Sequence, residues 1–140
     1  MNWDECLKKR IAKRIGKDSE LIKSLIKTSR NKMESEEKLN LTPVTSVSKI
    51  SLAYDSLREI LEALSIKEGY KIYNHECYTY FLKEILKQDL NGEEFDELRK
   101  IRNSINYYGK DLSIREAEDT LKRIKKLRKI LIKFIGFILS

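Results

Sequence analysis

Apolar residues recur along this chain mainly at intervals of three and four, which is the period of an amphipathic helix. The clearest pattern runs from about Val44 to Glu68, where one apolar stripe repeats at helical spacing and further residues widen it. The stripe consists of Val47, Ile50, Tyr54, Leu57, Leu61 and Leu64, and Ala53, Ile60 and Ala63 widen it. We therefore expect a long central helix that is buried against more than one neighbour.

The same period predicts five or six helices in all and no strands. The first helix is expected from about Asn2 to Ile15, and the second begins at a cap on Asp18 or Ser19. Thr42 is the expected N-cap of the central helix, with Pro43 at its first position.

Later in the chain, residues 70–73 are expected to form a connector, and Asn74 to cap the fourth helix. Asn91-Gly92 is interpreted as a turn that leads into a fifth helix ending at Gly109. A capping box from Ser113 to Glu116 starts the last helix, which extends towards Leu139.

Long helices joined by short loops favour an all-α fold, an up-and-down antiparallel bundle of four core helices with one or two accessory helices. The length of 140 residues predicts a single domain over residues 1–140. Cys6 and Cys77 have no partner at metal-ligand spacing, so they are expected to be buried thiols rather than a disulfide, and no metal or cofactor is expected.

The charge and the ends of the chain suggest a cytoplasmic protein with an acidic partner. The formal net charge is +7, which favours partners such as nucleic acid. The longest apolar run, Ile130 to Leu139, carries Lys133 and is too short to span a bilayer, so no membrane association is expected. Abundant Lys, Glu and Ile are typical of thermophilic proteins, although AT-rich coding produces the same usage.

The segment from Asp96 to Gly109 holds the most distinctive polar residues. On a helical wheel, Arg102 falls at the edge of the apolar face, Asn106 lies one turn further on, and Arg99 flanks both. An arginine at such a boundary can hold a phosphate or a carboxylate with its fork of donors. The alternative is that Arg102 pairs with a carboxylate of this chain, for which the candidates are Asp96, Glu97 and Glu116.

Arg102-Asn103 near the end of a helix resembles the motif of HEPN domains, which are small helical proteins found in archaea and bacteria. The resemblance extends to residues 53–64 and 69–82, and its core covers about residues 44–135. It implies an RNA- or nucleotide-binding domain in which the arginine holds a phosphate. Some members of that family are toxins paired with a minimal nucleotidyltransferase antitoxin, so the resemblance also implies a role of this kind.

The motif histidine of that family is replaced here by tyrosine. If the chain is an enzyme, the resemblance implies a metal-independent endoribonuclease with Arg102 and Tyr107 as catalytic candidates, but tyrosine, with a pKa of about 10, is a poor general base at pH 7. The candidate binding residues are Arg99, Arg102, Asn103, Asn106, Tyr107 and Tyr108. The resemblance also makes Tyr107 and Tyr108 candidates for modification by a nucleotidyltransferase.

Several alternatives stay open at this point. His75, the single histidine, is either a capping or packing residue or a functional group that lies near Arg102 in space. The basic run from Lys122 to Lys133 is either a solvated helix face or a track for RNA or DNA phosphates. The apolar tail either forms a homodimer or partner interface or packs against the first helix. The whole domain could also be a catalytically inactive module that binds a nucleotidyltransferase or another protein.

Overall fold

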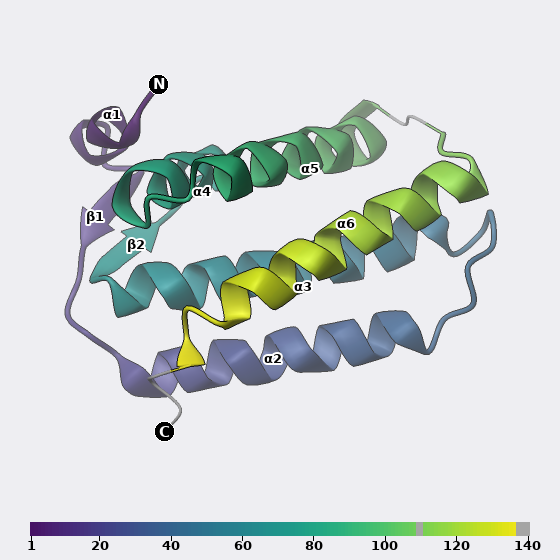
Figure 1. Ribbon diagram of the computed structural model, residues 1–140, viewed down its shortest axis with the longest axis horizontal. Helices are drawn as coiled ribbons and strands as arrows, with labels where there is room; N and C mark the ends of the chain where they lie inside the picture. The colour runs from purple at the N-terminus through teal and green to yellow at the C-terminus, as the bar shows by residue number, and fades with distance from the viewer. Residues whose placement is uncertain (109–110, 137–140) are drawn as a thin grey trace.

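Four long helices run alongside one another in the part of the chain that the computed structural model describes, residues 1–108 and 111–136 (Figure 1). For Tyr107 and Tyr108, only the backbone is described. The long helices are α2 (Ser19–Glu37), α3 (Ser46–Lys67), α5 (Asp89–Tyr108) and α6 (Ile114–Ile132). The described chain is mostly helical, in agreement with the predicted all-α class, although it also contains a small sheet.

The central helix α3 forms the middle of the core, as its wide apolar face predicted. It packs most extensively against α2 and α6, and α6 crosses in front of it in Figure 1. Ala53, Tyr54, Leu57 and Ile60 are completely buried. Because α3 has neighbours on several sides, apolar residues are needed on more than one stripe of its surface.

The start of α3 differs from the prediction. Thr42 is not its N-cap, because the helix begins at Ser46 and Thr45 holds the cap position. Thr42 and Thr45 instead bond each other reciprocally: each hydroxyl accepts from the other residue's backbone N–H, at 2.9 and 3.2 Å. This pair holds Pro43 and Val44 in a turn ahead of the helix.

The predicted first helix from Asn2 to Ile15 is wrong in its second half. The helix α1 (Trp3–Lys8) ends early, and Arg10 adopts a left-handed backbone with φ of 59°. The chain then forms a strand, β1 (Ala12–Arg14). The four-residue spacing of apolar residues in this segment suits a helix, but pairing with a distant strand prevails over it.

The partner strand, β2 (Tyr70–Ile72), lies where a connector was expected, so the prediction of no strands is also wrong. The two strands are antiparallel, with Ala12 opposite Ile72 and Arg14 opposite Tyr70. Gly69 makes the turn from α3 into β2 with φ of 89°, a conformation that glycine adopts without strain. In Figure 1 this sheet lies with α1 at the end of the molecule opposite the α2–α3 and α5–α6 connections.

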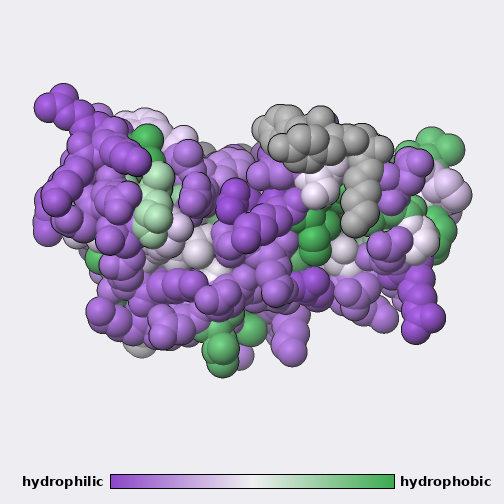
Figure 2. Space-filling model, turned by 90° about the horizontal axis from the view of Figure 1, so that it is seen from above, coloured by the Kyte–Doolittle hydropathy of each residue, from purple (hydrophilic) through white to green (hydrophobic). Residues whose placement is uncertain are grey.

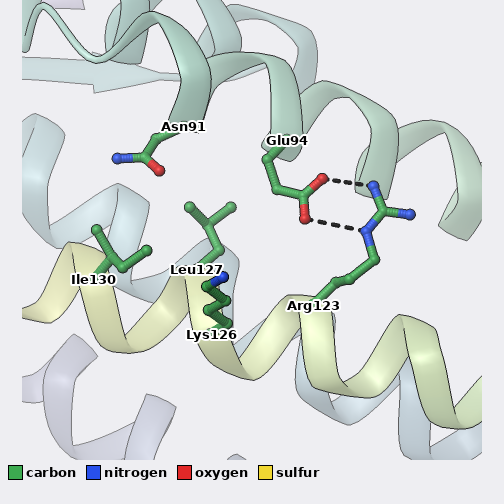
Figure 3. Close-up of a pocket in the computed structure, with 6 residues that line it drawn as sticks. All are labelled: Asn91, Glu94, Arg123, Lys126, Leu127 and Ile130. Carbon is green, nitrogen blue, oxygen red and sulfur yellow. Dashed lines mark hydrogen bonds and ion pairs between the residues drawn. The ribbon is translucent and has the colours of Figure 1, made fainter.

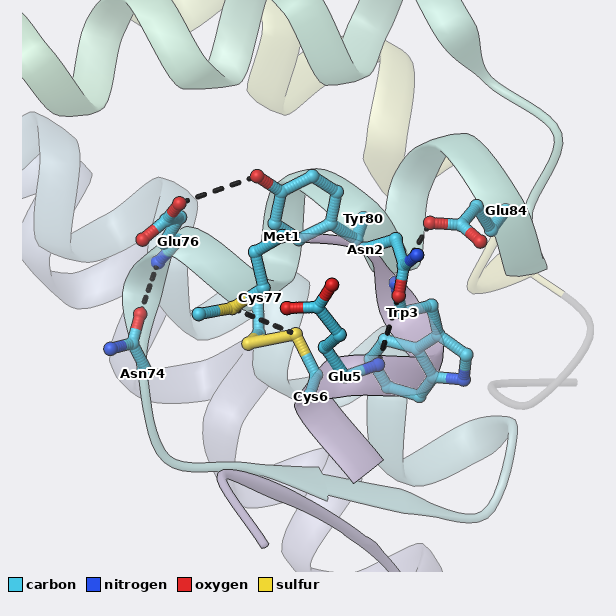
Figure 4. The surroundings of a disulfide bond; sticks show 10 residues. All are labelled: Met1, Asn2, Trp3, Glu5, Cys6, Asn74, Glu76, Cys77, Tyr80 and Glu84. Atoms are coloured by element: carbon cyan, nitrogen blue, oxygen red, sulfur yellow. Dashed lines mark hydrogen bonds between the residues drawn. A yellow bond between two sulfur atoms is a disulfide. The ribbon is translucent and has the colours of Figure 1, made fainter. Parts of the chain in front are cut away.

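Cys6 and Cys77 form a disulfide, which corrects the expectation of two separate thiols. The bond joins α1 to the short helix α4 (His75–Tyr80), and both cysteines are completely buried (Figure 4). Beside it, the backbone N–H of Trp3 donates to Glu84 at 2.8 Å. The sequence separation of 71 residues gave no local signal of this pairing.

Asn91-Gly92 is not a turn but part of α5. The break between helices comes earlier, where a π-helical turn, η1 (Phe81–Ile85), follows α4 and Lys87 adopts a φ of 57°. Gly92 permits a close approach between α5 and the preceding segment, because a Cβ there would lie 2.6 Å from Cγ of Lys83 and 3.1 Å from the Thr79 carbonyl oxygen.

The last helix begins as predicted, with both hydrogen bonds of the Ser113–Glu116 capping box present. It ends at Ile132, and residues 137–140 of the predicted extension lie outside the described residues. In the described part of the tail, Leu131 and Ile135 are buried within the chain. Lys67 of α3 donates to the Phe134 carbonyl at 2.5 Å, so this part packs near α3 rather than against the first helix.

Within the described residues, none of the helices combines the length and the apolar character that crossing a membrane would need.

Candidate functional site

A surface cavity lies where the N-terminal end of α4 faces the second half of α5. Its volume is about 340 Å³. The lining residues come from the end of the sheet, from α4 and from α5: Tyr73, Asn74, His75, Glu76, Arg99, Arg102 and Asn103. Three of the residues predicted on α5 as binding residues, Arg99, Arg102 and Asn103, therefore line a cavity together with residues of α4.

Arg102 lies at the boundary of the core, as the helical wheel predicted. Its guanidinium carbon is 5.2 Å from the centroid of the Tyr54 ring on α3. Tyr54 is completely buried and stacks on Phe95 of α5, with ring centroids 6.0 Å apart. A cation over an aromatic face is attracted by the ring quadrupole, so these two rings form a fixed base for the Arg102 side chain.

The ion-pair alternative for Arg102 named three carboxylates, and two of them bind other cations. Asp96 accepts from Arg99 and also pairs with Lys100 at 3.1 Å. Glu97 pairs with Arg123 of α6. The third, Glu116, accepts from the backbone N–H of Ser113 in the capping box.

Arg99 is held in place by Asp96, one turn earlier on α5. Its Nε and Nη2 atoms donate to the same carboxylate oxygen at 3.2 and 2.8 Å. Burial opposes ionisation of Asp96, but the hydrogen bonds from Arg99 and Lys100 outweigh it and lower the pKa of this carboxyl group. Asp96 is therefore a carboxylate at neutral pH, and it orients Arg99 at the edge of the cavity.

His75 lines the same cavity as Arg102, so the two residues lie near each other in space. It follows Asn74, whose side chain caps α4 by accepting from the backbone N–H of Glu76 at 2.7 Å, as predicted. The Nδ1 atom of His75 is 3.2 Å from the Tyr54 hydroxyl. Tyr54 thus contacts both cavity residues, with its ring under Arg102 and its hydroxyl beside His75.

Burial and the positive charges around His75 both favour its neutral imidazole. Burial is the largest cause, and the positive charges of Arg58 and Arg102 add to it, so that the pKa of His75 falls to about 4. Asp55 opposes this shift only in part. At pH 7 the cavity therefore presents two guanidinium groups and an uncharged imidazole.

The remaining predicted residues do not all reach this cavity. Asn103 lines it, whereas Asn106 is exposed and lies outside the described lining. The side chains of Tyr107 and Tyr108, the candidates for catalysis, base stacking and modification, fall outside the described residues. The sequence did not single out Tyr73 or Glu76 as site residues, and their only signal was proximity to the cap at Asn74.

Glu76 is the acidic group in the lining of the cavity. It accepts a hydrogen bond from the hydroxyl of Tyr80, one turn later on α4, at 3.3 Å. Both residues appear in Figure 4 beside the disulfide at Cys77. The described lining thus holds two arginines and one carboxylate, and Asp96 beside the cavity balances the charge of Arg99.

A second cavity, of about 260 Å³, lies between α5 and α6 (Figure 3). Arg123 of α6 donates to both oxygens of Glu94, at 3.0 and 2.5 Å, and its hydrogen bonds lower the pKa of that carboxyl group. Leu127 and Ile130 supply an apolar wall. Because Arg123 and Glu94 bind each other across the two helices, this cavity resembles a packing contact more than a ligand site.

Three members of the basic run on α6 bind other helices of the fold, and four are exposed. Arg123 binds α5, Arg128 donates to the Ser29 hydroxyl at 3.1 Å, and Lys125 pairs with Glu36 at 2.8 Å. The exposed members are Lys122, Lys126, Lys129 and Lys133. Figure 2 shows that the face seen from above, over α1 and α5, is also mostly hydrophilic.

In the part of the chain that the structure describes, no group of three or more histidine, cysteine, aspartate or glutamate residues is arranged to hold a metal ion. Comparisons of the chain with protein-family models, with curated proteins and with solved structures found no match.

Proposed function

We propose that this protein is a HEPN-like, RNA- or nucleotide-binding helical domain that holds a phosphate in the cavity between α4 and α5. The observation that carries the proposal is that Arg99, Arg102 and His75 line one cavity, although His75 is distant from the two arginines in sequence. The Arg102-Asn103 motif and the net charge of +7 support the same ligand.

Arg102 has the chemistry and the support that phosphate binding requires. A guanidinium presents parallel donors that match two oxygens of a phosphate, and such charge-assisted hydrogen bonds are among the stronger ones in proteins. The Tyr54 ring lies 5.2 Å from its guanidinium carbon and limits the positions that this group can adopt. Less side-chain entropy is then lost when a ligand binds.

The cavity suits a small part of a nucleic acid. Its volume of about 340 Å³ lies at the lower end of the range for ligand sites, roughly 300–1,000 Å³. Asn103 adds an amide that can donate to a phosphate or to a ribose hydroxyl. We infer that one phosphate and its ribose occupy the cavity and that the remaining nucleotides lie on the surrounding surface.

If the bound RNA is cleaved, His75 is a better candidate for the base than the tyrosines of the motif. A neutral imidazole can accept the proton of a ribose 2′-hydroxyl as that oxygen attacks the adjacent phosphorus. A 2′,3′-cyclic phosphate then forms, the bond from phosphorus to the 5′-oxygen of the next nucleotide breaks, and the departing 5′-oxygen takes a proton from water. With a pKa of about 4, His75 is a weak base in the free protein. A bound phosphate would offset the charge of Arg102 and so raise this pKa, while burial, the largest cause of the shift, would continue to lower it.

The proposal is tested by measuring binding and cleavage of a mixed pool of RNAs in the presence of EDTA. The parent is compared with Arg102→Ala and with Arg30→Ala, which removes an exposed arginine from α2 and serves as the charge-matched control. We expect Arg102→Ala to weaken binding about tenfold or more, because it removes charge-assisted hydrogen bonds to the ligand. Arg30→Ala should bind as the parent does.

Thermal melting separates a binding role from a structural one. Arg102→Ala should lose RNA affinity with little change in melting temperature, whereas parallel losses would indicate that Arg102 only stabilises the fold. RNA binding that is equal in all three proteins would contradict the proposal. It would favour the alternative role as an inactive module that binds a nucleotidyltransferase or another protein.

A further inference from the structure

Tyr73 projects from a rigid position next to the cavity. It follows β2 directly, and its backbone N–H donates to the Ile11 carbonyl at 2.8 Å. Side chains alternate between the two faces of a strand. Tyr70 and Ile72 are buried, so Lys71 and Tyr73 lie on the opposite, outer face of the small sheet.

The ring of Tyr73 is unusually exposed for an aromatic residue of this chain. Its relative exposure is 55%, and every other aromatic side chain that the structure describes is buried or half-buried. It nevertheless lines the same cavity as His75 and Arg102. An exposed ring beside a cationic cavity contributes little to the core, but it offers a flat apolar surface to a ligand.

A lysine side chain, that of Lys13, lies beside the Tyr73 ring. Lys13 is opposite Lys71 in the sheet, which makes it a diagonal neighbour of Tyr73 on the same face. Its Nζ atom is 5.6 Å from the centroid of the Tyr73 ring. Lys13 is exposed, so its ammonium group can move from the ring to a phosphate without disturbing the core.

We propose that Tyr73 is the platform on which a nucleobase stacks when the adjoining phosphate is bound by Arg99 and Arg102, with Lys13 facing the next phosphate of the strand. This inference rests on the proposed function and specifies its ligand as single-stranded RNA. Bases in a duplex are already stacked, whereas an unpaired base can turn onto an aromatic ring. Stacking tolerates any base, so little sequence preference is expected from this contact.

The experiment compares a ligand that carries nucleobases with one that carries phosphate groups alone. Binding of a short single-stranded RNA and of inorganic triphosphate is measured by calorimetry for the parent, Tyr73→Ala, Tyr73→Phe and Arg102→Ala. We expect Tyr73→Ala to weaken RNA binding about tenfold and to leave triphosphate binding unchanged. Tyr73→Phe should bind both ligands as the parent does, because phenylalanine retains the ring. Arg102→Ala should weaken both.

The outcomes separate this inference from the proposed function. If Tyr73→Ala binds RNA as tightly as the parent while Arg102→Ala loses both ligands, the stacking platform is wrong and the phosphate site stands. If Tyr73→Ala loses RNA and triphosphate equally, its effect is not stacking, and the inference is again overturned. If the parent binds neither ligand, the proposed function fails and this inference fails with it. Melting temperatures confirm that each variant is folded.

Discussion

At the scale of single residues, Tyr54 organises the candidate site from inside the core. Its ring lies under Arg102, and its hydroxyl lies 3.2 Å from Nδ1 of His75. Burial raises the pKa of Tyr54 well above its usual value, so the hydroxyl remains protonated at any pH at which the protein works. One buried tyrosine therefore positions a cation and a neutral imidazole in one cavity.

His75 is a direct reporter of the cavity because it is the single histidine of the chain. In protein without a polyhistidine tag, NMR titration of its ring should give a pKa of about 4. Arg102→Ala should raise this value, since it removes a nearby positive charge and admits water. Arg30→Ala should leave it unchanged. A pKa near 6.5 in the parent would show that His75 is neither buried nor close to the arginines.

The lowered pKa of His75 also makes stability depend on pH. Between about pH 4 and 6.5 the unfolded chain binds a proton at this residue and the folded protein does not, so stability falls as the pH decreases through this range. We expect the melting temperature to drop less between pH 7 and pH 4.5 in His75→Gln than in the parent. An equal drop in both proteins would mean that His75 does not contribute to the acid sensitivity.

At the scale of secondary-structure elements, a buried ion cluster joins three helices. Glu36, near the end of α2, is completely buried and pairs with Lys49 of α3 and Lys125 of α6, each at 2.8 Å. Lys49 also donates to the carbonyl groups of Glu36 and Leu39 at 2.8 and 2.6 Å. This cluster fixes the end of α2 against α3 and α6, and none of its three residues lines the candidate site.

Removing one partner of this cluster should be costly. Glu36→Leu leaves Lys49 buried without its carboxylate, and breaking a buried pair in this way typically costs about 3–5 kcal/mol. Denaturant unfolding should show this loss for Glu36→Leu and a smaller one for the double variant Glu36→Leu/Lys49→Met, in which only the half-buried Lys125 of the cluster keeps its charge. A double variant that is less stable than the single variant would contradict this account.

The disulfide between α1 and α4 should stabilise the end of the molecule that carries the sheet. Its sequence separation of 71 residues closes a long loop, for which loop entropy predicts a contribution of about 4 kcal/mol. Reduction should lower the melting temperature and increase hydrogen exchange in α1. The double variant Cys6→Ala/Cys77→Ala should not respond to reductant. Two free thiols in the unreduced, denatured protein would contradict the bond.

The secondary-structure elements that can be predicted from the sequence are those with local signals. Helical periodicity was sufficient for α3, and capping chemistry was sufficient for the starts of α4 and α6, because these signals are local. The strand at residues 12–14 carried no local signal that outweighed the helical one, since its stability depends on pairing with residues 70–72. The pair Asn91-Gly92 favours a turn in the sequence, whereas Gly92 lies in α5 and permits a close contact with Lys83 that depends on the tertiary structure.

At the scale of the whole molecule, the candidate site joins parts of the chain that the sequence treats separately. Arg99, Arg102 and Asn103 were predictable from the helical wheel and the motif, because all three lie on one helix. His75 and Tyr73 were not assigned to the site, because their proximity to Arg102 results from the packing of α4 and β2 beside α5. Long-range packing of this kind determines half of the cavity.

The central claim is that a phosphate-bearing ligand binds in the cavity between α4 and α5. The most direct test is an NMR titration that follows the ring resonances of His75 as single-stranded RNA is added to the parent and to Arg102→Ala. The account predicts progressive, saturable shifts in the parent and much weaker ones in the variant. Saturable RNA binding without any change at His75 would place the ligand elsewhere on the protein and contradict the account.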